Sequence, residues 1–139
     1  MLRIVLDTNV LISGTYWTGD SYRILEFMDE GKIIGITTKE ILKEYDRIIH
    51  SEEILARIDE IQLLQRAPTL KIFEKMTVIE PIVRLNVIAH DPDNKFLEAA
   101  VEGKANYIVS RDHHLLDLKE YQGIKIITPE KFLKIIQTK

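Results

Sequence analysis

The chain has 139 residues, of which 45% are hydrophobic and 29% charged, and it contains no Cys. That length is sufficient for one domain with its own core, and the lack of Cys excludes a disulfide scaffold, a thiolate zinc site and a cysteine nucleophile. The 19 Lys and Arg against 22 Asp and Glu give a net charge of −3, which argues against a protein that coats nucleic acid through bulk positive charge. We expect one cytoplasmic domain over residues 1–139, without a signal peptide or a membrane-spanning helix.

The first part of the chain alternates between strand-like and helix-like patterns. The β-branched run Leu2–Leu6 predicts a buried strand, which is followed by a short helix and a loop. An apolar stripe over Asp20–Glu30 predicts a second helix. Ile33–Thr37 predicts a second strand, and a third helix is expected to begin near Thr38.

The middle of the chain is less regular. Ser51 is typical of an N-cap, and helical spacing of apolar residues continues from there up to Pro68. Met76–Pro81 predicts a third strand, whereas residues 82–88 fit more than one conformation. His90–Asn94 has the composition of a loop and precedes another amphipathic helix.

The last part of the chain returns to clear alternation. The helix before it is expected to end at Gly103, and Asn106–Ser110 predicts a strong strand. Ile124–Ile127 predicts another strand, after which Thr128 and Pro129 supply an N-cap and a first-turn proline for a final helix. Strands that alternate with helices over short connections predict an α/β fold with a mostly parallel central sheet flanked by helices.

Two acidic residues follow predicted strands directly. Asp7 comes after Leu2–Leu6, and Asp112 lies two residues beyond Asn106–Ser110. Each has a simple structural explanation as the N-cap of the next helix. Because ligands of parallel sheets bind beyond the carboxyl ends of the strands, two aspartates at one sheet edge also suggest a shared site.

Helix geometry adds two further acidic residues to this edge. Asp93 is expected on the helix face that packs against the sheet, whereas Glu98 of the same helix is expected to face solvent. In the third helix Glu44 lies nearer the apolar face than Glu40, which we expect to form a capping box with Thr37. Carboxylates that converge in this way require a cation, and oxygen ligands favour Mg²⁺ or Mn²⁺.

The whole chain from Leu2 to about Ile136 resembles the PIN-domain family, of the kind found as the toxin in VapC-type toxin–antitoxin pairs. Four segments in order carry the resemblance: Val5–Ser13, Thr38–Glu44, Asp91–Ala100 and Ala105–Asp112. The resemblance implies a Rossmann-like fold and an endoribonuclease that cleaves single-stranded RNA through water activated by Mg²⁺ or Mn²⁺. It also implies a cognate antitoxin and a homodimer as partners.

The resemblance also implies roles for particular residues. The catalytic and metal-binding acids would be Asp7, Glu44, Asp93 and Asp112. Asn9 and Ser110 match polar positions that hold the acids in place, and Thr8 would turn the chain after the first strand, a role that simple turn chemistry explains equally well. The loop around Asp93 is one residue shorter than is common in the family, so Asp91 could share its role. Arg111 replaces a common Gly and, with Lys43 and Lys95, is a candidate for RNA contact.

Three alternatives remain open at this stage. A haloacid-dehalogenase-like phosphatase needs a second Asp two positions after the first, where this chain has Asn9. A phosphoreceiver domain needs an acidic pair after the first strand and a Lys after the fifth, and neither is evident. A catalytically silent metal- or protein-binding module would keep most of the pattern. We regard His113 and His114 as weak metal ligands, because an all-oxygen site does not require imidazole.

Overall fold

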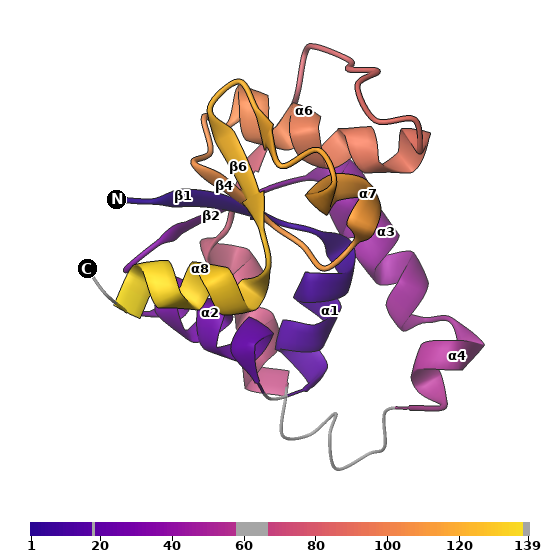
Figure 1. Cartoon of the computed structure of the whole chain (residues 1–139). Helices are drawn as coiled ribbons and strands as arrows, with labels where there is room; N and C mark the ends of the chain where they lie inside the picture. The colour runs from indigo at the N-terminus through magenta and orange to yellow at the C-terminus, as the bar shows by residue number, and fades with distance from the viewer. Residues whose placement is uncertain (18, 58–66, 138–139) are drawn as a thin grey trace.

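The computed structural model describes residues 1–17, 19–57 and 67–137, and it shows a sheet with helices on both faces (Figure 1). In the described part of the chain the sheet has six strands in the order β3-β2-β1-β4-β6-β5. Their bounds are β1 Arg3–Leu6, β2 Ile34–Thr38, β3 Thr77–Ile79, β4 Tyr107–Val109, β5 Glu120–Tyr121 and β6 Ile124–Ile127. All neighbouring strands run parallel except β5 and β6. The predicted α/β fold with a mostly parallel sheet is confirmed.

Helices cover the two faces of this sheet unequally. Their bounds are α1 Thr8–Tyr16, α2 Asp20–Asp29, α3 Lys39–Ile49, α4 Glu52–Leu55, α6 Asn94–Glu102, α7 His113–Leu116 and α8 Pro129–Gln137, with 3-10 helices η1 Ala67–Lys75 and η2 Asp91–Asp93. Figure 1 shows α6 on one face of the sheet and α1, α2 and α8 on the other. The central strand β1 is therefore buried on both sides, and its residues Ile4, Val5 and Leu6 are at most 1% exposed. No helix of the described residues is both long and apolar enough to cross a membrane.

The sheet contains one point where the strand order reverses. The chain proceeds from β1 through β2 to β3 on one side, and then returns to place β4 on the other side of β1. Helices on opposite faces diverge at such a point, and they leave a crevice beyond the carboxyl ends of the two strands. Asp7 follows β1 at this place, and Ser110 to Asp112 follow β4.

Several elements differ from the sequence-based prediction. Of the helix predicted from Ser51 to Pro68, the structure describes α4 with the turn after it and, at the other end, the start of η1 at Ala67, while 58–66 lie outside the described residues. The prediction also lacks η1, α7 and the short β5. The cap of α3 is Thr38, whose Oγ1 accepts from the Ile41 amide at 3.2 Å, and not Thr37. The shift arises because β2 continues one residue further than expected.

The prediction that Glu98 faces solvent is wrong. Its side chain is 6% exposed, and the irregular segment 80–90 contacts it through Arg84 and Leu85. Glu98 accepts hydrogen bonds from Arg84 Nη1 at 3.1 Å and from the Leu85 amide at 2.8 Å. Asn94 fixes the same segment through the amides of Val87 and Ile88. Helical periodicity within α6 contains no information about a distant segment that covers its outer face.

Candidate functional site

Asp7 is the most deeply buried acid of the sheet edge, with 3% of its surface exposed. Its Oδ1 accepts from the Val10 amide at 2.8 Å and so caps α1, while its Oδ2 accepts from Ser110 Oγ. The pKa of Asp7 is raised to about 6, because burial and the nearby carboxylates of Asp112 and Asp93 together outweigh the lowering effect of the two hydrogen bonds. The N-cap explanation therefore holds for this residue, and its carboxylate also lies within reach of the charges of Asp112 and Asp93.

Ser110 connects the ends of β1 and β4. Its side chain is fully buried, and its Oγ donates to Asp7 while it accepts from the Asp112 amide at 2.9 Å. Asp112 in turn caps α7, because its Oδ1 accepts from the His114 amide at 2.8 Å. The hydroxyl of Ser110 thus fixes the positions of two acids that come from different strands.

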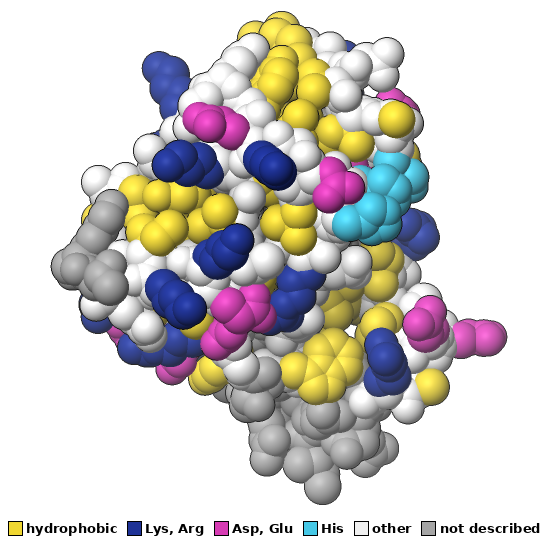
Figure 2. Space-filling model, in the orientation of Figure 1, with side chains coloured by type: hydrophobic (Ala, Val, Ile, Leu, Met, Phe, Trp, Pro, Cys, Tyr) yellow, Lys and Arg dark blue, Asp and Glu magenta, His cyan; other side chains and the backbone are white. Residues whose placement is uncertain are grey.

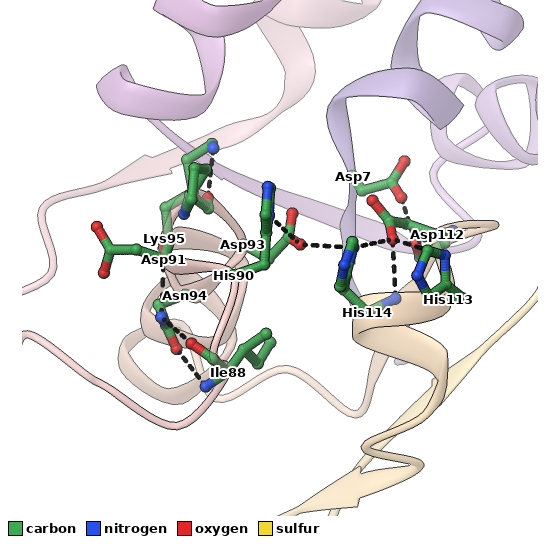
Figure 3. Close-up of polar contacts among 12 residues, drawn as sticks. Asp7, Ile88, His90, Asp91, Asp93, Asn94, Lys95, Asp112, His113 and His114 are labelled. Carbon is green, nitrogen blue, oxygen red and sulfur yellow. Dashed lines mark hydrogen bonds and ion pairs between the residues drawn. The ribbon is translucent and has the colours of Figure 1, made fainter.

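Asp93 approaches the same edge of the sheet from η2. It is 6% exposed, and its Oδ2 lies 2.9 Å from His90 Nδ1. Asp91 is exposed, and Figure 3 shows its carboxylate pointing away from Asp93 and Asp112. Because Asp93 contributes to the raised pKa of Asp7, it is the acid of this loop that the fold brings to Asp7.

Glu44 lies on α3 in a different electrostatic setting. Its Oε2 is 2.6 Å from Lys95 Nζ, which also donates to the Pro92 carbonyl at 2.5 Å. Lys95 is 7% exposed. The expectation that Lys95 contacts RNA therefore needs correction, because its ammonium is buried and engaged by two protein oxygens. Lys95 was a candidate because it lies near the acidic motif in the sequence, which contains no information about the packing of α3 against α6.

The remaining predicted residues surround the acids. Thr8 is buried, and its Oγ1 has no hydrogen-bond partner within the described ranges. Asn9 is exposed and lines a surface pocket with Arg111, Asp112, His113 and His114. Arg111 also forms an ion pair with Glu130, which lowers the pKa of that glutamate. Lys43 is exposed on α3.

The chemistry of this donor set fits a hard divalent cation. Asp93 and Asp112 are close enough to Asp7 for their negative charges to raise its pKa. Three ionised carboxylates without a cation are therefore electrostatically unfavourable here. Carboxylate oxygens are the ligands that Mg²⁺ and Mn²⁺ prefer. The three aspartates therefore have both the ligand type and the excess of negative charge that such an ion requires.

Two histidines lie closer to the acids than sequence reasoning suggested. His114 Nδ1 is 3.1 Å from Asp112 Oδ1 and 3.8 Å from Asp93 Oδ2, and the His90 ring stacks on that of His114 (Figure 3). His90 belongs to the loop before η2, whereas His114 belongs to α7. Their proximity depends on the packing of two separate connections, so no local sequence signal indicates it.

Comparisons with known proteins agree with this architecture. A family model for the PIN domain matches residues 3–114. The uncharacterized protein MJ1680 of Methanocaldococcus jannaschii is 31% identical over 144 residues, covering 96% of this chain and 90% of the relative. PAE2754 from Pyrobaculum aerophilum has a TM-score of 0.61 at 13% identity, covering 99% of this chain and 98% of its own. VapBC2 from Rickettsia felis, solved bound to a DNA fragment from its promoter, has a TM-score of 0.56 at 13% identity, covering 90% of this chain and 97% of the matched chain. The chain therefore belongs to the PIN-domain family.

Proposed function

We propose that the protein is a Mg²⁺- or Mn²⁺-dependent endoribonuclease that cleaves single-stranded RNA. The observation that carries the proposal is the convergence of Asp7, Asp93 and Asp112 beyond the ends of β1 and β4, where Ser110 links Asp7 to Asp112 and His114 lies between Asp112 and Asp93. Membership of the PIN-domain family supports it, because PIN domains are generally nucleases. The similarity of fold to VapBC2 supports the further proposal that this chain is the toxin of a toxin–antitoxin pair.

In this proposal Asp7, Asp93 and Asp112 hold the metal, and Glu44 completes the acidic set from α3. A divalent ion held by these residues would supply activation of water and neutralisation of the charge that develops on the scissile phosphate. Ser110 Oγ donates to the carboxylate of Asp7 and accepts from the backbone amide of Asp112, while the His114 amide donates to the Asp112 carboxylate, so both carboxylates are restrained. Lys95 restrains Glu44 and offsets its charge, which leaves the three aspartates as the main uncompensated acids.

RNA must approach a protein with a net charge of −3, so contacts to phosphate have to come from a few local cations. We propose Arg111 for this role, because it lies beside Asp112 on the rim of the surface pocket. Lys43 is proposed as a second contact, because it is exposed on the same helix as Glu44. A cytoplasmic location, a homodimer and an antitoxin partner complete the proposal for a single PIN domain over residues 1–139.

The test is cleavage of an end-labelled single-stranded RNA in Mn²⁺ or Mg²⁺, with EDTA as the negative condition. Asp7→Asn and Asp112→Asn are each expected to abolish cleavage while the protein remains folded. Asp117→Asn is the matched control, because this aspartate is exposed and caps the other end of α7. Asp93→Asn should reduce cleavage more than Asp91→Asn, in line with the burial of the two side chains. Full activity of Asp7→Asn, or of the wild type in EDTA, would contradict the proposal.

A further inference from the structure

We propose that His90, Asp93 and His114 form a binding site for a divalent transition-metal ion of the Zn²⁺ class. The site shares Asp93 with the acidic centre but differs from it in ligand chemistry, since imidazole supplies two of its three ligands. Binding at this site does not depend on the ribonuclease activity. Only one consequence, competition between Zn²⁺ and Mg²⁺ for Asp93, rests on the proposed function.

The geometry brings the three side chains to one point. One potential ligand atom from each of them lies within 4.8 Å of those of the other two. His90 Nδ1 is 2.9 Å and His114 Nδ1 is 3.8 Å from the same oxygen, Oδ2 of Asp93. The two rings are nearly parallel, with centroids 4.6 Å apart and planes inclined by 13° (Figure 3). Two imidazoles from separate loops therefore converge on a single carboxylate.

The chemistry of this set differs from that of a magnesium site. Imidazole nitrogen suits Zn²⁺ and other transition metals, whereas Mg²⁺ prefers oxygen ligands alone. Two histidines and one carboxylate are a known set of three protein ligands for zinc, with a fourth position left for water or substrate. The side chain of Asp93 is 9% exposed and provides a fixed anchor. The histidines are 48% and 40% exposed, so an ion can reach them from solvent.

A neighbouring combination of Asp112, His113 and His114 shares one histidine with this site. His113 is 75% exposed, and its Nδ1 lies 3.9 Å from Asp112 Oδ1, so it is held less firmly than His90. Figure 2 shows histidine side chains gathered in one patch on the surface, with an acidic side chain at its edge. Asp93 is more buried than Asp112, and the distance from His90 to Asp93 is shorter than that from His113 to Asp112. We therefore assign the ion to His90, Asp93 and His114. His113 then provides a matched control.

The experiment measures Zn²⁺ affinity of the full chain by competition with a chromogenic chelator, without RNA. We expect one tight site, and Co²⁺ in its place should give the visible absorption of a low-coordinate ion with nitrogen ligands. His90→Gln and His114→Gln should each weaken Zn²⁺ binding by at least about tenfold, while His113→Gln remains within about threefold of wild type. Circular dichroism checks that each variant is folded. The substituted histidines are exposed, so we expect the variants to fold.

Two results would overturn the inference. One is an equal affinity of wild type and the His90→Gln/His114→Gln double variant, and the other is a loss in His113→Gln as large as in His90→Gln. Asp7→Asn separates this inference from the proposed function, because it removes one acid of the acidic centre but none of the three proposed zinc ligands, and should leave Zn²⁺ affinity within about threefold. Zinc binding that survives in Asp7→Asn, with no RNA cleavage by the wild type, supports the histidine site and refutes the ribonuclease. RNA cleavage by the wild type without histidine-dependent zinc binding supports the ribonuclease and refutes the histidine site.

Discussion

Asp7→Asn is expected to make the metal-free protein more stable at neutral pH while it abolishes RNA cleavage. The substitution preserves the shape of the side chain, and Asn is as good an N-cap as Asp. Its Oδ1 can still accept from the Val10 amide, and its Nδ2 can donate to Ser110 Oγ. What it removes is the negative charge of a carboxylate that is 3% exposed and lies near two other acids.

The size of the effect follows from the pKa of Asp7. Folding raises it from 3.8 to about 6, so the folded state holds this proton more tightly than the unfolded chain does. The resulting stabilisation is complete below pH 3.8 and is lost as the pH rises to about 6. At pH values above both pKa values, that rise corresponds to a loss of about 3 kcal/mol in the free energy of unfolding. The difference in unfolding free energy between Asp7→Asn and wild type should therefore grow by up to about 3 kcal/mol between pH 4 and 7.

The measurement is urea unfolding of both proteins in EDTA across this pH range. Taking the difference between them cancels the titration of groups that do not interact with Asp7, so the change with pH reports on Asp7 and the carboxylates coupled to it. A difference in unfolding free energy that stays constant with pH would refute the argument that burial and neighbouring carboxylates raise the pKa of Asp7. Added Mn²⁺ should then stabilise the wild type and have little effect on Asp7→Asn, since a ligand that binds only the folded state raises its stability.

Three further variants test other contacts of the site. Lys95→Met leaves Glu44 without its cation and should lower the unfolding free energy by about 2 kcal/mol, and adding Glu44→Gln should restore most of it. Urea unfolding of the single and double variants decides this, and an additive double variant would contradict it. Ser110→Ala removes the bridge between β1 and β4 and should weaken Mn²⁺ binding by about 10–100-fold in calorimetry. Glu98→Ala frees the Leu85 amide, so hydrogen exchange at that amide should accelerate, whereas unchanged protection would mean that other contacts fix the segment.

The residues that sequence reasoning located correctly are those whose position depends on local rules. Asp7 lies at the end of β1, and Asp93 lies at the start of α6 on its buried side. Strand periodicity, helix phase and the rule that parallel strands end at one edge are sufficient to bring such residues together. The same rules gave the fold class and the approximate bounds of most strands.

The residues that were missed depend on contacts between distant segments. Glu98 is buried because segment 80–90 covers it, and that segment has no regular pattern of its own. Lys95 reaches Glu44 only because α3 and α6 are packed together. His90 and His114 meet where two separate connections approach each other. None of these contacts follows from the periodicity of a single element.

The most direct test of the central claim is the cleavage of a labelled single-stranded RNA by wild type, Asp7→Asn and Asp117→Asn in Mn²⁺. The account predicts EDTA-sensitive cleavage by wild type and Asp117→Asn, and none by a folded Asp7→Asn protein. Cleavage by Asp7→Asn at the wild-type rate would contradict it.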